Sequence, residues 1–154
     1  MPTFAIQPIS DELADHVRTN RSDPVWEHPA HECVPDAGPC RSCLGSVAGE
    51  PTLLFTHDSF AGRGEFKMPG PVYIHAERCE PYSDVSRFPE WALGKPLTFE
   101  AYGPGVTLMA VERATGDSGA EIIDHLLAEH PDAEYVNVRN TGAGCFLLRA
   151  DRAG

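Results

Sequence analysis

The sequence predicts an α+β fold, with a mainly antiparallel sheet of six to seven short strands, two helices and a long proline-rich N-terminal arm. Three observations support this prediction. Apolar residues alternate with polar ones over several short segments. Two other segments show helical spacing behind a capping residue, and residues 20–50 contain four prolines without periodicity. The length of 154 residues favours a single domain spanning residues 1–154.

The first two predicted elements follow one another closely. Residues 3–8 place Phe4 and Ile6 on one side of the chain, which is typical of a short strand. Ser10 then provides a hydroxyl that can cap a helix running to about Arg18.

Residues 20–50 are predicted to form an irregular arm. A loop of this length is uncommon inside a compact domain and needs something to hold it. The arm contains a Cys-x-x-Cys segment, formed by Cys40 and Cys43, which offers one means of holding it. A poorly ordered arm is the alternative. His28 and His31, spaced as H-x-x-H in the same stretch, are either further ligands or solvated loop residues.

The remaining elements alternate short strands with one helix. Strands are predicted near residues 53–55, 72–75, 135–138 and 145–149. The clearest hairpin spans 97–111, where alternation on both sides of a Gly-Pro-Gly turn predicts that Phe99 and Leu108 are buried on one face. Ser118 and Glu121 have the spacing of a capping box, which predicts a helix that ends before Pro131.

The charge balance excludes several classes of partner. The net charge is −11, and residues 77–134 hold twelve acidic residues against four basic ones. Nucleic-acid binding requires a basic surface that neutralises phosphates, and anionic membranes require the same, so neither partner is expected. The N-terminal residues lack the basic start and apolar run of a signal peptide, and a cytoplasmic location is therefore expected.

The cysteines and one histidine suggest a metal site. Cys40, Cys43 and Gly45 form a C-x-x-C-x-G segment, in which two thiolates on a tight turn can share one ion and the glycine permits a positive φ. His75 and Cys79 form a second pair at the end of a predicted strand. Together they make a Cys₃His set, which is a known composition of structural zinc sites. The alternative is that the cysteines are small buried hydrophobic residues.

Two other functions remain open from the sequence. A thiol-dependent enzyme would use Cys145 or Cys40 as its nucleophile, with Arg41 binding an anionic substrate. Its base would be His57 or His75. The second function that remains open is that of a metal-free acidic protein-interaction domain. A thioredoxin-like role is disfavoured because that motif starts a helix, whereas Pro39 and Gly45 flank this one. Substrate, partner and oligomeric state do not follow from these patterns.

Four ordered segments together resemble a bacterial family known only as domain of unknown function 1203. They are Pro-Cys-Arg-Ser-Cys-Leu (39–44), Gly-Glu-Pro-Thr-Leu-Leu (49–54), Gly-Pro-Val-Tyr-Ile-His-Ala-Glu (70–77), and Val-Arg-Asn (138–140) with Gly-Cys-Phe-Leu-Leu-Arg (144–149). The resemblance spans about residues 39–152. It implies a bacterial cytosolic protein without an assigned activity, and it emphasises Cys40, Arg41 and Cys145 as candidate site residues.

Overall fold

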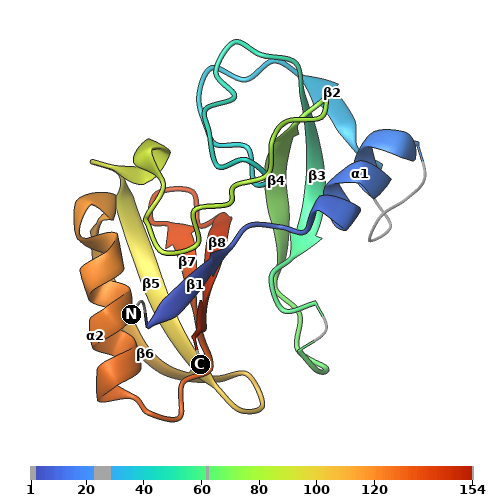
Figure 1. Cartoon of the computed structure of the whole chain (residues 1–154). Coiled ribbons are helices and arrows are strands. Elements are labelled where there is room, and N and C mark those ends of the chain that lie inside the picture. Colours follow the sequence, from blue (N-terminus) through green and yellow to red (C-terminus); the bar gives the residue numbers. More distant parts are fainter. Residues whose placement is uncertain (1–2, 23–28, 62, 154) are drawn as a thin grey trace.

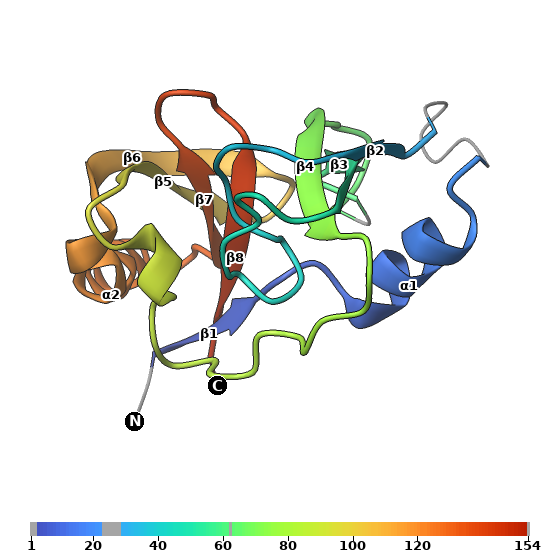
Figure 2. The same ribbon diagram turned by 90° about the horizontal axis from the view of Figure 1, so that it is seen from above.

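A computed structural model describes residues 3–22, 29–61 and 63–153 of the chain. Within these residues the fold is α+β, as predicted, with two α-helices and eight strands arranged in two antiparallel sheets (Figure 1). The two sheets lie side by side, and each has a helix packed against it (Figure 2). None of the helices in the described ranges is long and apolar enough to cross a membrane.

The larger sheet has five strands in the order β1-β8-β7-β5-β6. They are β1 (Phe4–Gln7), β5 (Pro96–Gly103), β6 (Thr107–Thr115), β7 (Tyr135–Asn140) and β8 (Phe146–Arg152). Helix α2 (Gly119–Glu129) covers one face and buries Ile123 and Leu127 against Phe99 and Val138 of the sheet. This interface forms the larger of the two main hydrophobic cores.

The smaller sheet has three strands in the order β2-β3-β4, which are β2 (His31–Cys33), β3 (Thr52–Asp58) and β4 (Pro69–His75). Helix α1 (Asp11–Thr19) packs against it through Ala14 and Val17, which meet Leu53 and Ile74 in the second core. The predicted cap is confirmed, because the Leu13 backbone N–H donates to Ser10 Oγ at 3.1 Å.

The predicted hairpin forms, but its two marker residues lie in different environments. Phe99 is fully buried, whereas half of Leu108 is exposed. The pairing is Ala101 with Ala110 but Tyr102 with Leu108, so a β-bulge adds one residue to β6. Because strand side chains alternate with period two, one extra residue turns Leu108 to the opposite face. The prediction for Leu108 was therefore wrong.

The predicted capping box at Ser118 is also wrong. A 3₁₀ turn, Gly116–Ser118, runs directly into α2, and the Ser118 side chain makes no capping hydrogen bond to the helix within the described structure. The Ser118 backbone has φ −98° and ψ 9° rather than the extended conformation of a typical N-cap. Because the turn before α2 is already helical, Ser118 does not have the extended backbone that a capping hydroxyl requires.

The irregular arm is not confirmed as predicted. Residues 31–33 form β2, which pairs antiparallel with β3. A three-residue edge strand with one cysteine and two polar residues has no alternation that sequence periodicity could detect. Residues 34–51 contain neither helix nor strand in the described structure, although Pro39 and Cys40 make isolated bridges. His28 lies outside the described residues, and His31 is exposed on β2.

Candidate metal centre

The segment from Gly38 to Val47 forms a tight turn that presents the Cys-x-x-Cys pair. The Cys40 N–H donates to the Gly45 carbonyl at 2.7 Å, and the Leu44 N–H donates back to the Cys40 carbonyl at 2.7 Å. Two residues of the turn have a positive φ, Gly38 at 123° and Leu44 at 59°, and Gly45 does not have one, so the predicted role of Gly45 was wrong. A left-handed leucine costs about 1 kcal/mol or more, and the Leu44 side chain offsets this by packing into the larger core.

The turn lies against β4. Cys40 forms a parallel bridge with Tyr73, and the Arg41 N–H donates to the Tyr73 carbonyl at 2.9 Å. His75 is the last residue of β4, and Cys79 lies in the loop that follows it. Attachment of the turn to the strand therefore brings the two halves of the predicted Cys₃His set to the same place.

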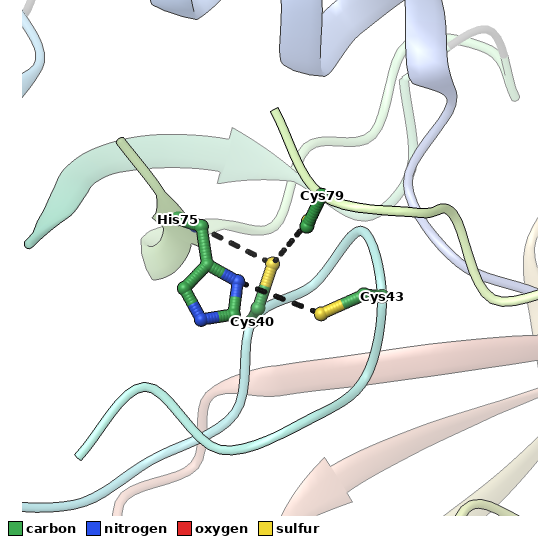
Figure 3. A group of neighbouring side chains, drawn as sticks. All are labelled: Cys40, Cys43, His75 and Cys79. Carbon is green, nitrogen blue, oxygen red and sulfur yellow. Dashed lines mark hydrogen bonds between the residues drawn. The ribbon is translucent and has the colours of Figure 1, made fainter. Parts of the chain in front are cut away.

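The four side chains converge (Figure 3). One ligand atom from each of Cys40, Cys43, His75 and Cys79 lies within 4.8 Å of all the others. The Cys40 and Cys79 Sγ atoms are 3.7 Å apart, and Cys43 Sγ is 3.5 Å from His75 Nδ1. All five cysteines of the chain are free thiols, so the short sulfur–sulfur distance is not a disulfide.

These distances agree with the edges of a tetrahedral metal site. Zinc–sulfur bonds of about 2.3 Å at a tetrahedral angle place two sulfurs about 3.8 Å apart, and a zinc–nitrogen bond of about 2.05 Å places sulfur and nitrogen about 3.6 Å apart. The observed 3.7 Å and 3.5 Å lie close to both values. The group can therefore hold a metal ion without rearrangement of these two pairs.

Hydrogen bonding stabilises one thiolate in the group. The Cys43 thiol and the backbone N–H groups of Cys43, His75 and Ser42 lower the pKa of Cys40 to about 4, although burial opposes this change. The His75 N–H lies 3.4 Å from Cys40 Sγ. The shared proton raises the pKa of Cys43, and burial raises the pKa of Cys79. A site that already stabilises a thiolate suits a cation, which requires deprotonated sulfur ligands.

Two further residues surround the group and were missed by the sequence analysis. Glu50 Oε2 lies 2.6 Å from His75 Nε2, although the angles between the two groups are not those of a hydrogen bond. Arg18, at the end of α1, donates from Nε to the His75 carbonyl at 3.0 Å and from Nη2 to Cys79 Sγ at 3.5 Å. Nothing in the spacing of Glu50 or Arg18 predicts this, because the β3–β4 register and the packing of α1 bring them here.

A hollow of about 280 Å³ opens beside the group, bordered by Glu50, His75 and Cys79. It gives solvent, and therefore ions and chelators, a path to the ligand atoms. Cys40, by contrast, is fully buried behind the others.

The structure places the other predicted site residues elsewhere. Arg41 is buried, and its guanidinium donates from Nε to the Phe146 carbonyl at 2.7 Å and from Nη1 to the Pro39 carbonyl at 2.8 Å. Burial lowers its pKa to about 10, so it stays charged at neutral pH. These contacts join the turn to β8 and give Arg41 a structural role, while anion binding by Arg41 stays a prediction. Cys145 lies outside the four-residue group, in a separate hollow that also contains His57.

The fold and the site together define a small α+β protein with a clustered set of three cysteines and one histidine. The chain belongs to the family described as Protein of unknown function (DUF1203), which matches it over residues 37–152 and includes all four clustered residues. The predicted family membership is thereby confirmed. Comparison with curated proteins and with solved structures finds no match for this chain.

Proposed function

We propose that Cys40, Cys43, His75 and Cys79 bind one zinc ion, and that the protein is a small cytoplasmic binding or structural module stabilised by it. The observation that supports this most directly is the convergence of four ligand atoms from a turn, a strand end and a loop. Three sulfurs and one imidazole nitrogen are ligands that zinc accepts in tetrahedral sites. A reducing cytoplasm would keep the thiols available for the metal.

The proposed role of the metal is structural. Four protein ligands complete a tetrahedral site, whereas a catalytic zinc keeps one position for water or substrate. The ion would link the 38–47 turn to the end of β4 and to the loop that follows. Since a preformed site rarely exists in an unfolded chain, binding the metal would contribute directly to the free energy of folding.

Arg18 and Glu50 fit this proposal as outer partners of the ligands. Three thiolates around a divalent cation leave a net charge of −1, and the Arg18 guanidinium beside Cys79 would balance it. The Glu50 carboxylate faces His75 Nε2, while Nδ1 faces Cys43. A carboxylate behind a ligating histidine fixes the orientation of the ring, which is a common arrangement around protein-bound zinc.

Elemental analysis of the purified protein tests the proposal. We expect one zinc per chain in the wild type and in Cys33→Ser, a matched control because Cys33 lies on β2 outside the group. We expect Cys79→Ser to lose most of the zinc. Less than about one tenth of an equivalent in wild-type protein that has been refolded with excess zinc would refute the proposal.

Alkylation mapped by mass spectrometry provides a second test, which does not require a measurement of the zinc content. Coordinated thiolates react slowly, so Cys40, Cys43 and Cys79 should be labelled together, and only after a chelator is added. Simple burial predicts slow labelling that the chelator does not change. Rapid labelling of Cys43 in the metal-replete protein would contradict the zinc site and favour a thiol-dependent reaction instead.

A further inference from the structure

A second hollow lies where the two sheets meet, away from the cysteine and histidine group. It measures about 250 Å³, and β3, β4, β7 and the loop before β8 surround it. The polar side chains in its wall are His57, Ser59, Arg139 and Cys145. A neighbouring hollow of about 290 Å³ shares His57 and Ser59, and it extends to Arg149 and the start of α1. The two hollows therefore adjoin along the junction of the sheets.

Three residues in the wall of this space each have one buried polar atom without a hydrogen-bond partner among the described residues. These atoms are His57 Nδ1, Ser59 Oγ and Arg139 Nε. Ser59 is only 6 % exposed. Leaving a buried donor or acceptor unpaired destabilises the fold, so such groups rarely gather at one place unless something satisfies them. The three unpaired atoms indicate a polar ligand.

The pairing of the charged groups around the hollow shows which donor is left for that ligand. Arg139 Nη2 pairs with Glu100 at 3.0 Å, which leaves Nε free to donate elsewhere. Burial lowers the pKa of His57 to about 4, and the charges of Arg41 and Arg149 contribute, while Asp58 opposes the shift. Asp58 is itself occupied, since its Oδ1 accepts from the N–H groups of Phe60 and Met68.

Two of the arginines around the hollows are paired with carboxylates, Arg139 with Glu100 and Arg149 with Asp151. The unpaired Arg139 Nε, rather than an excess of positive charge, therefore indicates the kind of ligand. A guanidinium N–H donates and cannot accept, so it recognises acceptor-rich groups. Oxyanions are such groups, and they form charge-assisted hydrogen bonds with a guanidinium.

We propose that the hollow between the sheets binds a small oxyanion, a carboxylate or phosphate group, through Arg139 Nε and Ser59 Oγ, with His57 as a neutral third partner. Its volume suits a molecule of metabolite size rather than a polymer. This site is independent of the zinc proposal, because it uses none of the four clustered residues. Cys145 lines the same wall and provides a reporter of occupancy.

Iodoacetate is the probe, because it is itself a small carboxylate and leaves a stable mark. The Cys145 thiolate displaces iodide, so that a sulfur–carbon bond forms as the carbon–iodine bond breaks. Iodoacetamide performs the same reaction without the charge. At each cysteine, the rate with iodoacetate is divided by the rate with iodoacetamide. This ratio at Cys145, divided by the same ratio at the partly exposed Cys33, is the normalised ratio, and it measures recognition of the carboxylate.

In the metal-replete wild type we expect this normalised ratio to be about tenfold above unity, as a charge-assisted hydrogen bond would produce. Acetate and inorganic phosphate, added separately, should each slow the reaction of Cys145 with iodoacetamide if they occupy the hollow. Protection by one of them alone would identify the oxyanion class. A ratio near unity together with no protection by either anion would overturn the proposal.

Variants separate recognition from folding. Ser59→Ala should lower the normalised ratio several-fold while leaving the melting temperature unchanged or higher, because the hydroxyl has no partner in the described fold. The double variant Arg139→Gln/Glu100→Gln should abolish the preference without leaving Glu100 buried and unpaired. Arg113→Gln removes the same charge from an exposed position on β6 and should change nothing. Loss of stability in Ser59→Ala with an unchanged ratio would show a structural hydroxyl and refute the proposal.

Discussion

Removal of the metal should unfold the smaller sheet before the larger one. The core of the smaller sheet contains nine buried residues, against sixteen in the core of the larger one, and two of the nine, Cys40 and Val47, belong to the turn that the ion would hold. Structural zinc contributes about 10–16 kcal/mol in isolated metal-binding peptides. A whole domain is typically stable by only about 5–15 kcal/mol. The small core, once it has lost the turn, is therefore not expected to remain folded.

Hydrogen exchange measured by mass spectrometry, with and without a chelator, can resolve the two sheets. We expect amides in the 38–47 turn, β3 and β4 to exchange at least about a hundredfold faster after chelation, which corresponds to about 2.7 kcal/mol. Amides in β5, β7 and β8 should keep most of their protection, because Leu44 is the only residue of the turn among the sixteen buried residues of the larger core. If the protein carried stoichiometric zinc and the amides of the turn, β3 and β4 were equally protected with and without the chelator, the structural role of the metal would be refuted. Equal loss in both sheets would refute the reasoning from separate cores.

Three further predictions follow from individual contacts. Arg18→Gln should weaken zinc binding about 10–100-fold, measured by competition with a chromophoric chelator, because it removes the cation beside the Cys79 sulfur; unchanged affinity would contradict that role. His57 should bind its proton near pH 6.5 when unfolded but only near pH 4 when folded, so stability falls as the pH drops through this window. The unfolding free energy of wild type relative to His57→Gln should then decrease by about 3 kcal/mol between pH 7 and 4 in urea titrations, and a flat difference would show that the histidine is not buried uncharged. Gly116→Ala would place a Cβ in steric clash with the Ala92 carbonyl oxygen, so we expect at least about 2 kcal/mol of destabilisation by thermal denaturation, whereas the exposed Gly142→Ala should be nearly neutral.

The sequence by itself determines most of the secondary structure of this protein. Alternation and helical spacing are local properties, because each depends on which side of one strand or helix its neighbours occupy. They are sufficient to predict seven of the strands, both helices and the Ser10 cap. The four clustered cysteine and histidine residues could also be found from the sequence, since Cys-x-x-Cys on a turn and His-x-x-x-Cys at a strand end are short-range patterns.

Only the tertiary structure decides what depends on pairing between distant segments. The bulge that exposes Leu108 arises from how β6 aligns with β5, and β2 exists because β3 offers it an edge. Glu50 reaches His75 through the β3–β4 register, and Arg18 reaches Cys79 through the packing of a helix.

Of all these features, the hollow between the two sheets depends most strongly on the tertiary structure. Its polar residues come from β3 and the turn directly after it, from β7 and from the loop before β8, and they form no motif in the sequence. Sequence spacing reports the distance between residues along one strand or helix, whereas such a site depends on distances across elements. Those distances are set by hydrogen-bond register and core packing, which involve the whole chain at once.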